Sequence, residues 1–402
     1  MTIPASGPAA PQPPTTAPGA SDGAGPSCPN CGAEVGPGDS FCEACGTELS
    51  PTATPPAAPS DGSAGGLESP ITVSRSLRAM AVEAQQTAPV GRPCLNCGGL
   101  VGADGYCETC GTKAPSERDH YTETPAQWVA AVCDRGIRHH RNEDATAVAA
   151  HSDPGSRAVL VVCDGVSTSL DSDVASLAAA RAARDSLFLA QPAGLGTPTS
   201  RAGAIARSVE AAAAAANAAV VANTAADSDN AASCTFAAAV IEGDLVVFGN
   251  VGDSRVYWVP DLDQPEAAAE LSLDDSVAQA RIAAGVPREE AENGPQAHAI
   301  MKWLGRDSPD FVPRTGAVTL ASSGWLLVCS DGLWNYASEA TALQRLIGQL
   351  DADRSAPLHL AQALVQWANE QGGKDNISVA LARHEVGVHG APPVDHHDAR
   401  RS

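Results

Sequence analysis

The sequence predicts an α+β domain in which mainly antiparallel sheets are layered against helices. Short apolar runs typical of strands appear from about residue 127 and come in clusters, not in strict alternation with helices. Between these clusters lie long stretches rich in alanine, the residue with the highest helix propensity. The preceding residues are dominated by Pro, Ala, Gly and pairs of cysteines, so we expect no large core there.

The individual elements follow from these patterns. Strands are expected at residues 128–133, 158–163, 235–241, 245–248, 255–259, 325–329 and 377–382. Helices are expected at residues 173–190, 204–225, 338–350 and 358–370. In the last helix Leu360, Leu364 and Trp367 recur at helical spacing, which predicts a buried stripe.

The 402 residues leave room for two or three domains. Small cysteine-rich modules are expected at 28–46 and 94–112, and the layered domain at 126–386. Three segments lack enough large apolar residues to form a core, and we expect them to be disordered: 1–27, the linker 47–91 and the tail 387–402.

The chain is strongly acidic, with 25 Lys and Arg against 47 Asp and Glu and a formal net charge of -22. Such a surface repels phosphate backbones and anionic lipids, so we expect no nucleic-acid and no membrane partner. No uninterrupted run of about 18 apolar residues occurs, and the first residues lack the features of a signal peptide. We therefore expect a cytoplasmic protein whose 12 cysteines are thiols or metal ligands.

Eight cysteines form two similar quartets of CxxC pairs, each pair followed by glycine. This spacing is typical of zinc ribbons, in which four thiolates surround one structural Zn²⁺ and metal binding drives folding. Disulfides or a redox CxxC are the alternative interpretation. The expected ligands of the two zinc ions are Cys28, Cys31, Cys42 and Cys45, and Cys94, Cys97, Cys107 and Cys110. The other four, Cys133, Cys163, Cys234 and Cys329, lie in or beside apolar runs and are expected to be buried.

Acidic residues stand at the ends of several predicted strands: Glu143 and Asp144, Asp164, Asp253, Asp331 and Asp375. A single Asp in such a place is usually a turn residue. Several carboxylates converging in one domain would repel one another unless cations neutralise them. Oxygen ligands in this number favour Mg²⁺ or Mn²⁺.

The motifs RxxRNED, VCDG, SCT, GDSR, LVCSDGLW and GGKDNISV occur in this order over about residues 127–384. This series resembles the metal-dependent protein serine/threonine phosphatase family of the PP2C (or PPM) type. The resemblance implies a four-layer α-β-β-α sandwich, with two antiparallel sheets flanked by helices. It also implies hydrolysis of phosphoserine and phosphothreonine in proteins. Residues 271–305 are similar to the family's flap beside the active site, and we call them the flap segment.

Carried over by position, the resemblance assigns roles in binding two or three Mn²⁺ or Mg²⁺ ions. Asp164 bridges two ions and the carbonyl of Gly165 ligates the second. Asp331 and Asp375 hold the first. Asp144, with Glu143, anchors the second through water, and Asp253 matches the residue tied to a weaker third ion. In such two-metal sites the ions activate a water molecule that attacks phosphorus directly.

Some positions depart from the family pattern. The family's phosphate-binding Arg falls on His139, so we expect Arg138, or otherwise Arg141, to bind the phosphate. Ser167 and Thr168 replace two glycines after the Asp164 motif. In the flap segment Asp275 replaces a His, which leaves His139, His140 and His298 as candidates for protonating the leaving alkoxide.

The leading hypothesis is a phosphatase that reverses bacterial Ser/Thr kinase signalling on phosphorylated proteins, with a cognate kinase as a further partner. Its catalytic residues would be Asp164, Asp331, Asp375 and Arg138, and its zinc ribbons would bind partners or regulate. A narrower hypothesis has the phosphoserine of an anti-sigma-factor antagonist as substrate. The alternative, motivated by the departures from the pattern, is a non-catalytic pseudophosphatase adaptor.

Overall fold

The computed structural model of the chain describes residues 93–94, 97–189, 196–351 and 356–387. The chain divides into two compact units, Met1–Pro59 and Ser60–Ser402, and every described residue belongs to the second. The expected disordered segments 1–27 and 47–91 and the tail after residue 387 lie outside the described residues. The first predicted zinc ribbon, residues 28–46, also lies outside them.

Two antiparallel sheets form the centre of the domain. One sheet contains, in spatial order, β1 (His120–Ala126), β2 (Val129–Asp134), β13 (Ile377–His384), β12 (Gly324–Cys329), β8 (Arg255–Pro260) and β9 (Ala269–Glu270). The other contains β11 (Arg314–Thr319), β7 (Leu245–Val251), β6 (Phe236–Glu242), β4 (Ala158–Cys163) and β3 (Ala145–Ala150). A small pair joins β5 (Ser233–Cys234) to β10 (Leu304–Gly305).

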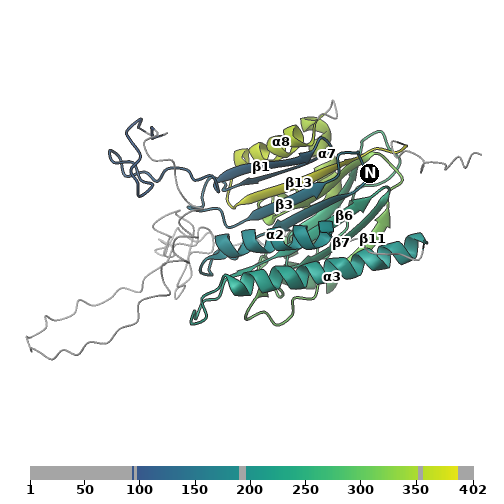
Figure 1. Cartoon of the computed structure of the whole chain (residues 1–402). Coiled ribbons are helices and arrows are strands. Elements are labelled where there is room, and N and C mark those ends of the chain that lie inside the picture. The colour runs from purple at the N-terminus through teal and green to yellow at the C-terminus, as the bar shows by residue number, and fades with distance from the viewer. Residues whose placement is uncertain (1–92, 95–96, 190–195, 352–355, 388–402) are drawn as a thin grey trace, which may run out of the picture. The chain divides into compact units, whose positions relative to one another are not determined.

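Helices cover the outer face of each sheet (Figure 1). The helices α2 (Ser172–Leu189) and α3 (Pro198–Ala222) pack on the sheet of β3, β4 and β7, while α7 (Ala340–Leu350) and α8 (Pro357–Glu370) pack on the sheet of β2, β8 and β13. Three short helices complete the described fold: α4 (Val277–Ala283), α5 (Arg288–Glu292) and α6 (Asp331–Trp334). The predicted four-layer α-β-β-α sandwich is confirmed.

Three buried apolar clusters hold the four layers together. Along β4, Val159 and Val161 face the α2 and α3 layer, whereas Leu160 and Val162 face the second sheet. A third cluster joins the second sheet to α7 and α8 and includes Leu327. Because successive side chains of a strand point to opposite faces, a strand buried on both sides needs an unbroken apolar run. Apolar runs of this kind are the ones predicted as strands from the sequence.

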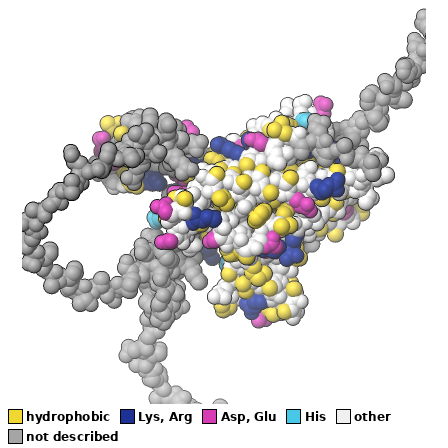
Figure 2. All heavy atoms as spheres, turned by 60° about the horizontal axis from the view of Figure 1, so that its bottom comes forward, with side chains coloured by type: hydrophobic (Ala, Val, Ile, Leu, Met, Phe, Trp, Pro, Cys, Tyr) yellow, Lys and Arg dark blue, Asp and Glu magenta, His cyan; other side chains and the backbone are white. Residues whose placement is uncertain are grey.

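The helix α3 is long and apolar enough, by length and composition alone, to cross a membrane. From the sequence we expect no such segment. Within the fold, however, α3 packs on α2 and β7 through buried residues such as Ile205 and Val209. On the face drawn in Figure 2, apolar side chains are interspersed with basic and acidic ones. The apolar character of α3 is thus explained by its place as a layer of the sandwich.

Candidate active site and zinc ribbon

The strand registers bring five aspartates together where their strands begin or end, along one edge of the two sheets. In the five-stranded sheet Ala145 pairs with Cys163, so Asp144 before β3 and Asp164 after β4 leave the sheet side by side. In the other sheet Cys329 at the end of β12 pairs with both Val379 and Arg255. The segments carrying Asp331, Asp375 and Asp253 therefore adjoin one another. This convergence was predicted from the strand ends.

The charges of these carboxylates act on one another. Burial, followed by the charges of Asp144, Asp331, Asp375 and Asp253, raises the pKa of Asp164 well above its usual range. Burial and the charge of Asp331 raise the pKa values of Asp144, to about 6, and of Asp375. The pKa of Asp253 is raised by burial and then by Asp331. Bringing such groups together without counter-charge is unfavourable.

The donor set fits hard divalent cations. Asp331 is buried, and its Oδ1 atom has no hydrogen-bond partner in the described part of the chain. An unpaired buried carboxylate oxygen is costly unless a ligand completes its environment. Carboxylate oxygens are the ligands that Mg²⁺ and Mn²⁺ prefer. Asp144, Asp164, Asp331 and Asp375 thus offer a suitable ligand set.

Hydroxyl groups that sequence reasoning missed hold these aspartates in place. The Ser330 hydroxyl donates to Asp144 Oδ2 at 2.6 Å and accepts from the Ser378 amide at 2.9 Å. The Thr235 hydroxyl accepts from the Asp164 amide at 3.0 Å and pairs with the Ser254 hydroxyl at 2.7 Å. Ser330 and Thr235 both lie inside motifs quoted from the sequence, LVCSDGLW and SCT. Their place in these motifs was the only sequence feature that could have indicated their role.

The loop before Asp144 is fixed by Asn376, another residue that the sequence did not single out. Its Oδ1 accepts from the Glu143 amide at 2.7 Å, and its Nδ2 donates to the carbonyls of Arg135 and Arg141 at 2.7 and 3.1 Å. Gly136 has a φ of +73°, and a Cβ atom there would collide with the carbonyl of Asp375. The RxxRNED and GGKDN motifs are therefore a single structural unit.

The carboxylate of Glu143 is held by neighbouring side chains of the protein. Its Oε1 accepts from Arg141 at 2.7 Å and from the Ser172 hydroxyl at 2.7 Å, and its Oε2 lies 3.8 Å from His139 Nδ1. Burial alone would raise its pKa, but hydrogen bonds from His139 and Ser172 and the charge of Arg141 lower it to about 2. Glu143 is thus paired within the protein, and its expected role beside Asp144 stays a prediction.

The basic residues of the loop before Asp144 differ in whether they pair with acidic side chains. His139 is largely buried, with Nε2 3.3 Å from Asp375 Oδ1; burial lowers its pKa, but Glu143 and Asp375 outweigh this and raise it to about 8. Arg141 is engaged by Glu143. Arg138 is exposed, and its backbone amide donates to the carbonyl of Gly373. Of the two arginines, Arg138 is the one whose guanidinium has no acidic partner among the described residues.

The flap segment adds two further groups. Asp275, which replaces the family's His, accepts from Arg314 at 2.9 Å and so is occupied by an ion pair. His298 is about half exposed, and its Nδ1 lies 3.9 Å from Asp331 Oδ2. Of the candidate acids, His298 is therefore beside the carboxylate cluster and open to solvent.

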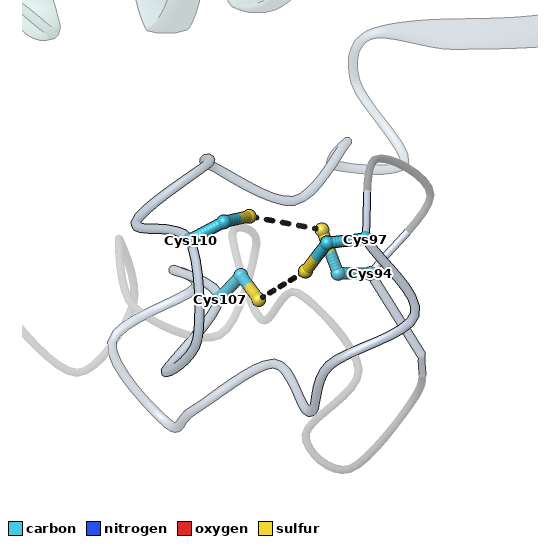
Figure 3. A group of neighbouring side chains, drawn as sticks. All are labelled: Cys94, Cys97, Cys107 and Cys110. Carbon is cyan, nitrogen blue, oxygen red and sulfur yellow. Dashed lines mark hydrogen bonds between the residues drawn. The ribbon is translucent and has the colours of Figure 1, made fainter.

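The second predicted zinc ribbon is present as a sulfur cluster (Figure 3). The ligand atoms of Cys94, Cys97, Cys107 and Cys110 all lie within 4.8 Å of one another, with Cys94 Sγ to Cys110 Sγ at 3.7 Å and Cys97 Sγ to Cys107 Sγ at 3.5 Å. Hydrogen bonds from Thr112 lower the pKa of Cys110 to about 5, which favours the thiolate. Among the described residues these four sulfurs are the only group of possible metal-ligand atoms gathered this closely.

Comparison with known families agrees with this geometry. The model of the protein phosphatase 2C family matches residues 136–369, which is more than half of the chain. The chain belongs to the protein phosphatase 2C family. The double zinc ribbon model matches residues 28–111 and covers both cysteine quartets.

Individual relatives of this family member are bacterial. The serine/threonine phosphatase stp of Listeria innocua is 31% identical over 153 residues, which are 38% of this chain and 57% of the relative. The protein phosphatase PhpP of Streptococcus pneumoniae is 32% identical over 149 residues, 37% of this chain and 56% of the relative. The matches thus span little more than half the length of these curated relatives.

Solved structures show the same fold. The serine/threonine phosphatase of S. agalactiae has a TM-score of 0.50 and 25% identity, covering 65% of this chain and 98% of that one. The phosphatase Stp1 of Staphylococcus aureus has a TM-score of 0.53 at 22% identity, with 64% and 94% of the two chains covered. The latter similarity concerns the fold alone.

Proposed function

We propose that this member of the protein phosphatase 2C family hydrolyses phosphoserine and phosphothreonine in proteins with Mn²⁺ or Mg²⁺. The observation that carries the proposal is the convergence of Asp144, Asp164, Asp253, Asp331 and Asp375 at one edge of the sandwich. The names of the Listeria and Streptococcus relatives support the same activity.

In this proposal two ions are held by Asp164, Asp331, Asp375 and Asp144, with the Gly165 carbonyl as a further ligand and Asp253 beside a third, weaker site. When bound, such ions supply Lewis-acid charge that activates water and neutralises phosphoryl oxygens. A side chain at Gly165 would collide with the carbonyl of Glu143, so only glycine brings the backbone this close.

The protein's own groups orient the reaction. Ser330 and Thr235 fix the orientation of Asp144 and of the backbone at Asp164. Exposed Arg138 binds phosphoryl oxygens through its planar guanidinium. His298, beside Asp331 and open to solvent, donates a proton to the leaving alkoxide of the substrate side chain.

The alternative of a non-catalytic adaptor is not favoured. A protein that only bound partners would gain nothing from several mutually repelling carboxylates at one edge. One departure that motivated the alternative is His139 at the position of the family's phosphate-binding Arg. In the structure His139 pairs with Glu143 and Asp375, and the exposed Arg138 next to it is available to bind phosphate.

The biological setting is also part of the proposal. We place the protein in the cytoplasm, acting on phosphoproteins made by a Ser/Thr kinase. The zinc ribbons, whose four thiolates leave no open position for chemistry, would recruit partners or regulate the phosphatase domain.

The test uses the full-length protein and a phosphothreonine peptide. With Mn²⁺ it should release phosphate, and EDTA should stop the reaction. Asp331→Asn should lower kcat/KM by about 100-fold or more, because an oriented metal ligand is lost. As a matched control, Asp185→Asn changes an exposed aspartate of α2 paired with Arg184 and should leave the rate unchanged. Full activity of Asp331→Asn, or of the EDTA-treated protein, would refute the proposal.

A further inference from the structure

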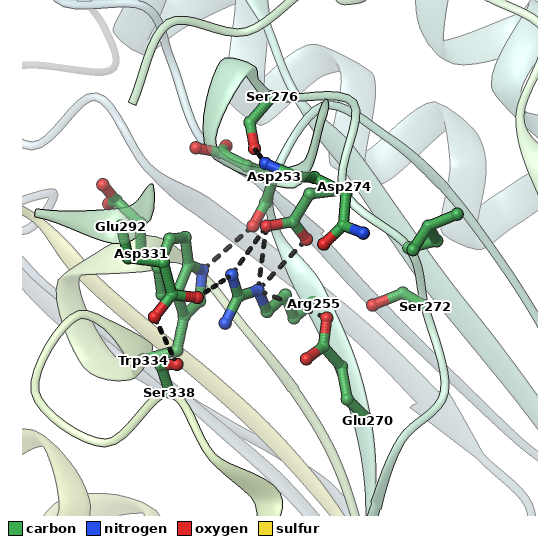
Figure 4. Close-up of polar contacts among 12 residues, drawn as sticks. Asp253, Arg255, Glu270, Ser272, Asp274, Ser276, Glu292, Asp331, Trp334 and Ser338 are labelled. Atoms are coloured by element: carbon green, nitrogen blue, oxygen red, sulfur yellow. Dashed lines mark hydrogen bonds and ion pairs between the residues drawn. The ribbon is translucent and has the colours of Figure 1, made fainter. Parts of the chain in front are cut away.

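A buried arginine lies among acidic side chains near Asp253 and Asp331 (Figure 4). Arg255 in β8 is 1% exposed, and its guanidinium carbon lies 3.5 Å from the centre of the Trp334 ring. A buried guanidinium stays charged and needs partners on all sides. These partners show what the residue connects.

Arg255 is bound mainly by residues on or next to the flap segment. Its Nε and Nη2 donate to Asp274 at 3.0 and 2.7 Å, and Nη2 also donates to Glu292 of α5 at 3.0 Å. Its Nη1 donates to the Tyr257 hydroxyl at 3.1 Å. Two carboxylates of the flap segment are therefore fixed by one cation from the central sheet.

A second cation extends the network. Arg288 at the start of α5 pairs with Glu270 of β9 at 3.0 Å and with Glu292 at 2.9 Å. The Ser338 hydroxyl, just before α7, donates to Glu292 at 2.7 Å. The base of α5 is thus held by charge-assisted hydrogen bonds, which are stronger than neutral ones.

Through Trp334, Arg255 is also connected to the segments of two proposed metal ligands. Trp334, on which the guanidinium stacks, belongs to α6, whose first residue is Asp331. The Trp334 Nε1 donates to the backbone carbonyl of Asp253 at 2.9 Å. The indole is therefore held between Arg255 and the segment of Asp253, and it fixes the helix that carries Asp331.

We propose that Arg255 is a positioning residue that couples the flap segment to the carboxylates of Asp331 and Asp253. This inference rests on the proposed phosphatase function. The network fixes two things together: the place of α5 and the orientation of α6. Weakening it loosens both, so that ion affinity falls at the same time as the flap becomes more mobile.

A purely structural role would predict only a loss of stability, and the chain contains a matched arginine for this comparison. Arg383 of β13, in the same sheet, is largely buried and pairs with Asp261 at 2.8 Å through both Nη1 and Nη2. Its guanidinium lies 5.1 Å from the centre of the Trp325 ring. The contacts of Arg383 with Asp261, Glu385 and Trp325 all lie outside the flap segment and α6.

The experiment compares Arg255→Lys with Arg383→Lys in the full-length protein. Lysine keeps the charge but loses the planar fork and the stacking surface. For Arg255→Lys we expect Mn²⁺ binding, measured by calorimetry, to weaken about 10-fold and kcat/KM to fall about 10- to 100-fold. Hydrogen exchange of amides in 288–293 and 331–335 should quicken. Arg383→Lys should leave all three quantities within about twofold of the wild type, whatever its melting temperature.

Two outcomes would overturn the inference. Equal behaviour of the two variants in Mn²⁺ affinity and exchange would overturn it. If Arg255→Lys does not fold, Glu292→Gln removes only the α5 side of the network and should quicken the same exchange; unchanged exchange and ion affinity would again overturn it. A wild-type protein without turnover would contradict the proposed function, while ion binding and exchange would still test the coupling.

Discussion

At the scale of single residues, the proposed metal ligands depend on neighbouring side chains that orient them, such as that of Ser330. Asp144 has a buried carboxylate whose Oδ2 is fixed by the Ser330 hydroxyl, and the same hydroxyl accepts from the Ser378 amide. Hydrogen bonds of this kind set the direction of a ligand's lone pairs. Ser330 therefore connects the segment of Asp331 to that of Asp144.

We predict that Ser330→Ala lowers the affinity for Mn²⁺ about 10- to 100-fold, because Asp144 loses the donor that orients it. The activation constant for Mn²⁺ in the phosphopeptide assay measures this. Ser156→Ala, which removes an exposed hydroxyl bonded to a turn carbonyl, is the control and should have no effect. An unchanged activation constant in Ser330→Ala would show that Asp144 is oriented by other contacts.

The aspartates were predictable from the sequence, whereas their supports were not. Asp164 and Asp331 follow unbroken apolar runs, a local pattern visible in one dimension. The partners of Asn376 are the backbone of Arg135, Arg141 and Glu143, more than 200 positions away, and only the fold brings them together. For the same reason the pairing of Glu143 with Arg141 and Ser172 was not foreseen.

At the scale of elements, burial on both faces decided which strands could be predicted. The runs at β4 and β12 are wholly buried and apolar. The unforeseen strands are different. β1 and β11 lie at sheet edges and are largely exposed, and β3 is so rich in alanine that its composition is typical of a helix. Pairing with β4 overrides that propensity.

The zinc ribbon gives a prediction at this scale. Cys107→Ser removes a buried ligand from the described quartet. The zinc content, measured by metal analysis, should fall from two ions per chain to one. A ribbon this small folds only with its metal. Cys329→Ala, in β12, changes a core cysteine far from the quartet in sequence and should keep both ions. Two zinc ions in Cys107→Ser would show that the described quartet is not a zinc site.

At the scale of the whole molecule, the sandwich places like charges close together, where side-chain packing opposes their separation. Three apolar clusters fix the two sheets relative to each other and to their helices. The carboxylates at the shared edge can therefore move apart only if the sheets do. The stability of the sandwich holds them together against their mutual repulsion.

This strain predicts a pH dependence for the metal-free protein. The pKa of Asp144 is raised to about 6 by burial, and those of Asp164, Asp253 and Asp375 are also raised. A carboxyl group with a raised folded-state pKa binds more protons in the folded protein. Its contribution to stability is complete below the unfolded pKa near 4 and is lost as the pH rises through the folded value.

The free energy of unfolding in EDTA should therefore fall between pH 5 and pH 8, by up to about 1.4 kcal/mol per pH unit for each proton involved. His139, with a pKa raised to about 8, acts in the same direction, whereas Glu143 matters only below about pH 4.5. Urea unfolding with and without Mn²⁺ measures this, and Mn²⁺ should restore stability most at high pH. Equal stability at pH 5 and pH 8 in EDTA would contradict the prediction.

The proposed paired-ion site is tested most directly by counting manganese ions, by calorimetry, on the zinc-loaded, full-length protein and on Asp331→Asn. Two Mn²⁺ ions per chain are predicted to bind to the wild type in addition to its zinc, and at least one should be lost in the variant. Binding of no Mn²⁺ to the wild type, or of the same number to Asp331→Asn with unchanged affinity, would contradict a paired-ion site at the converging aspartates.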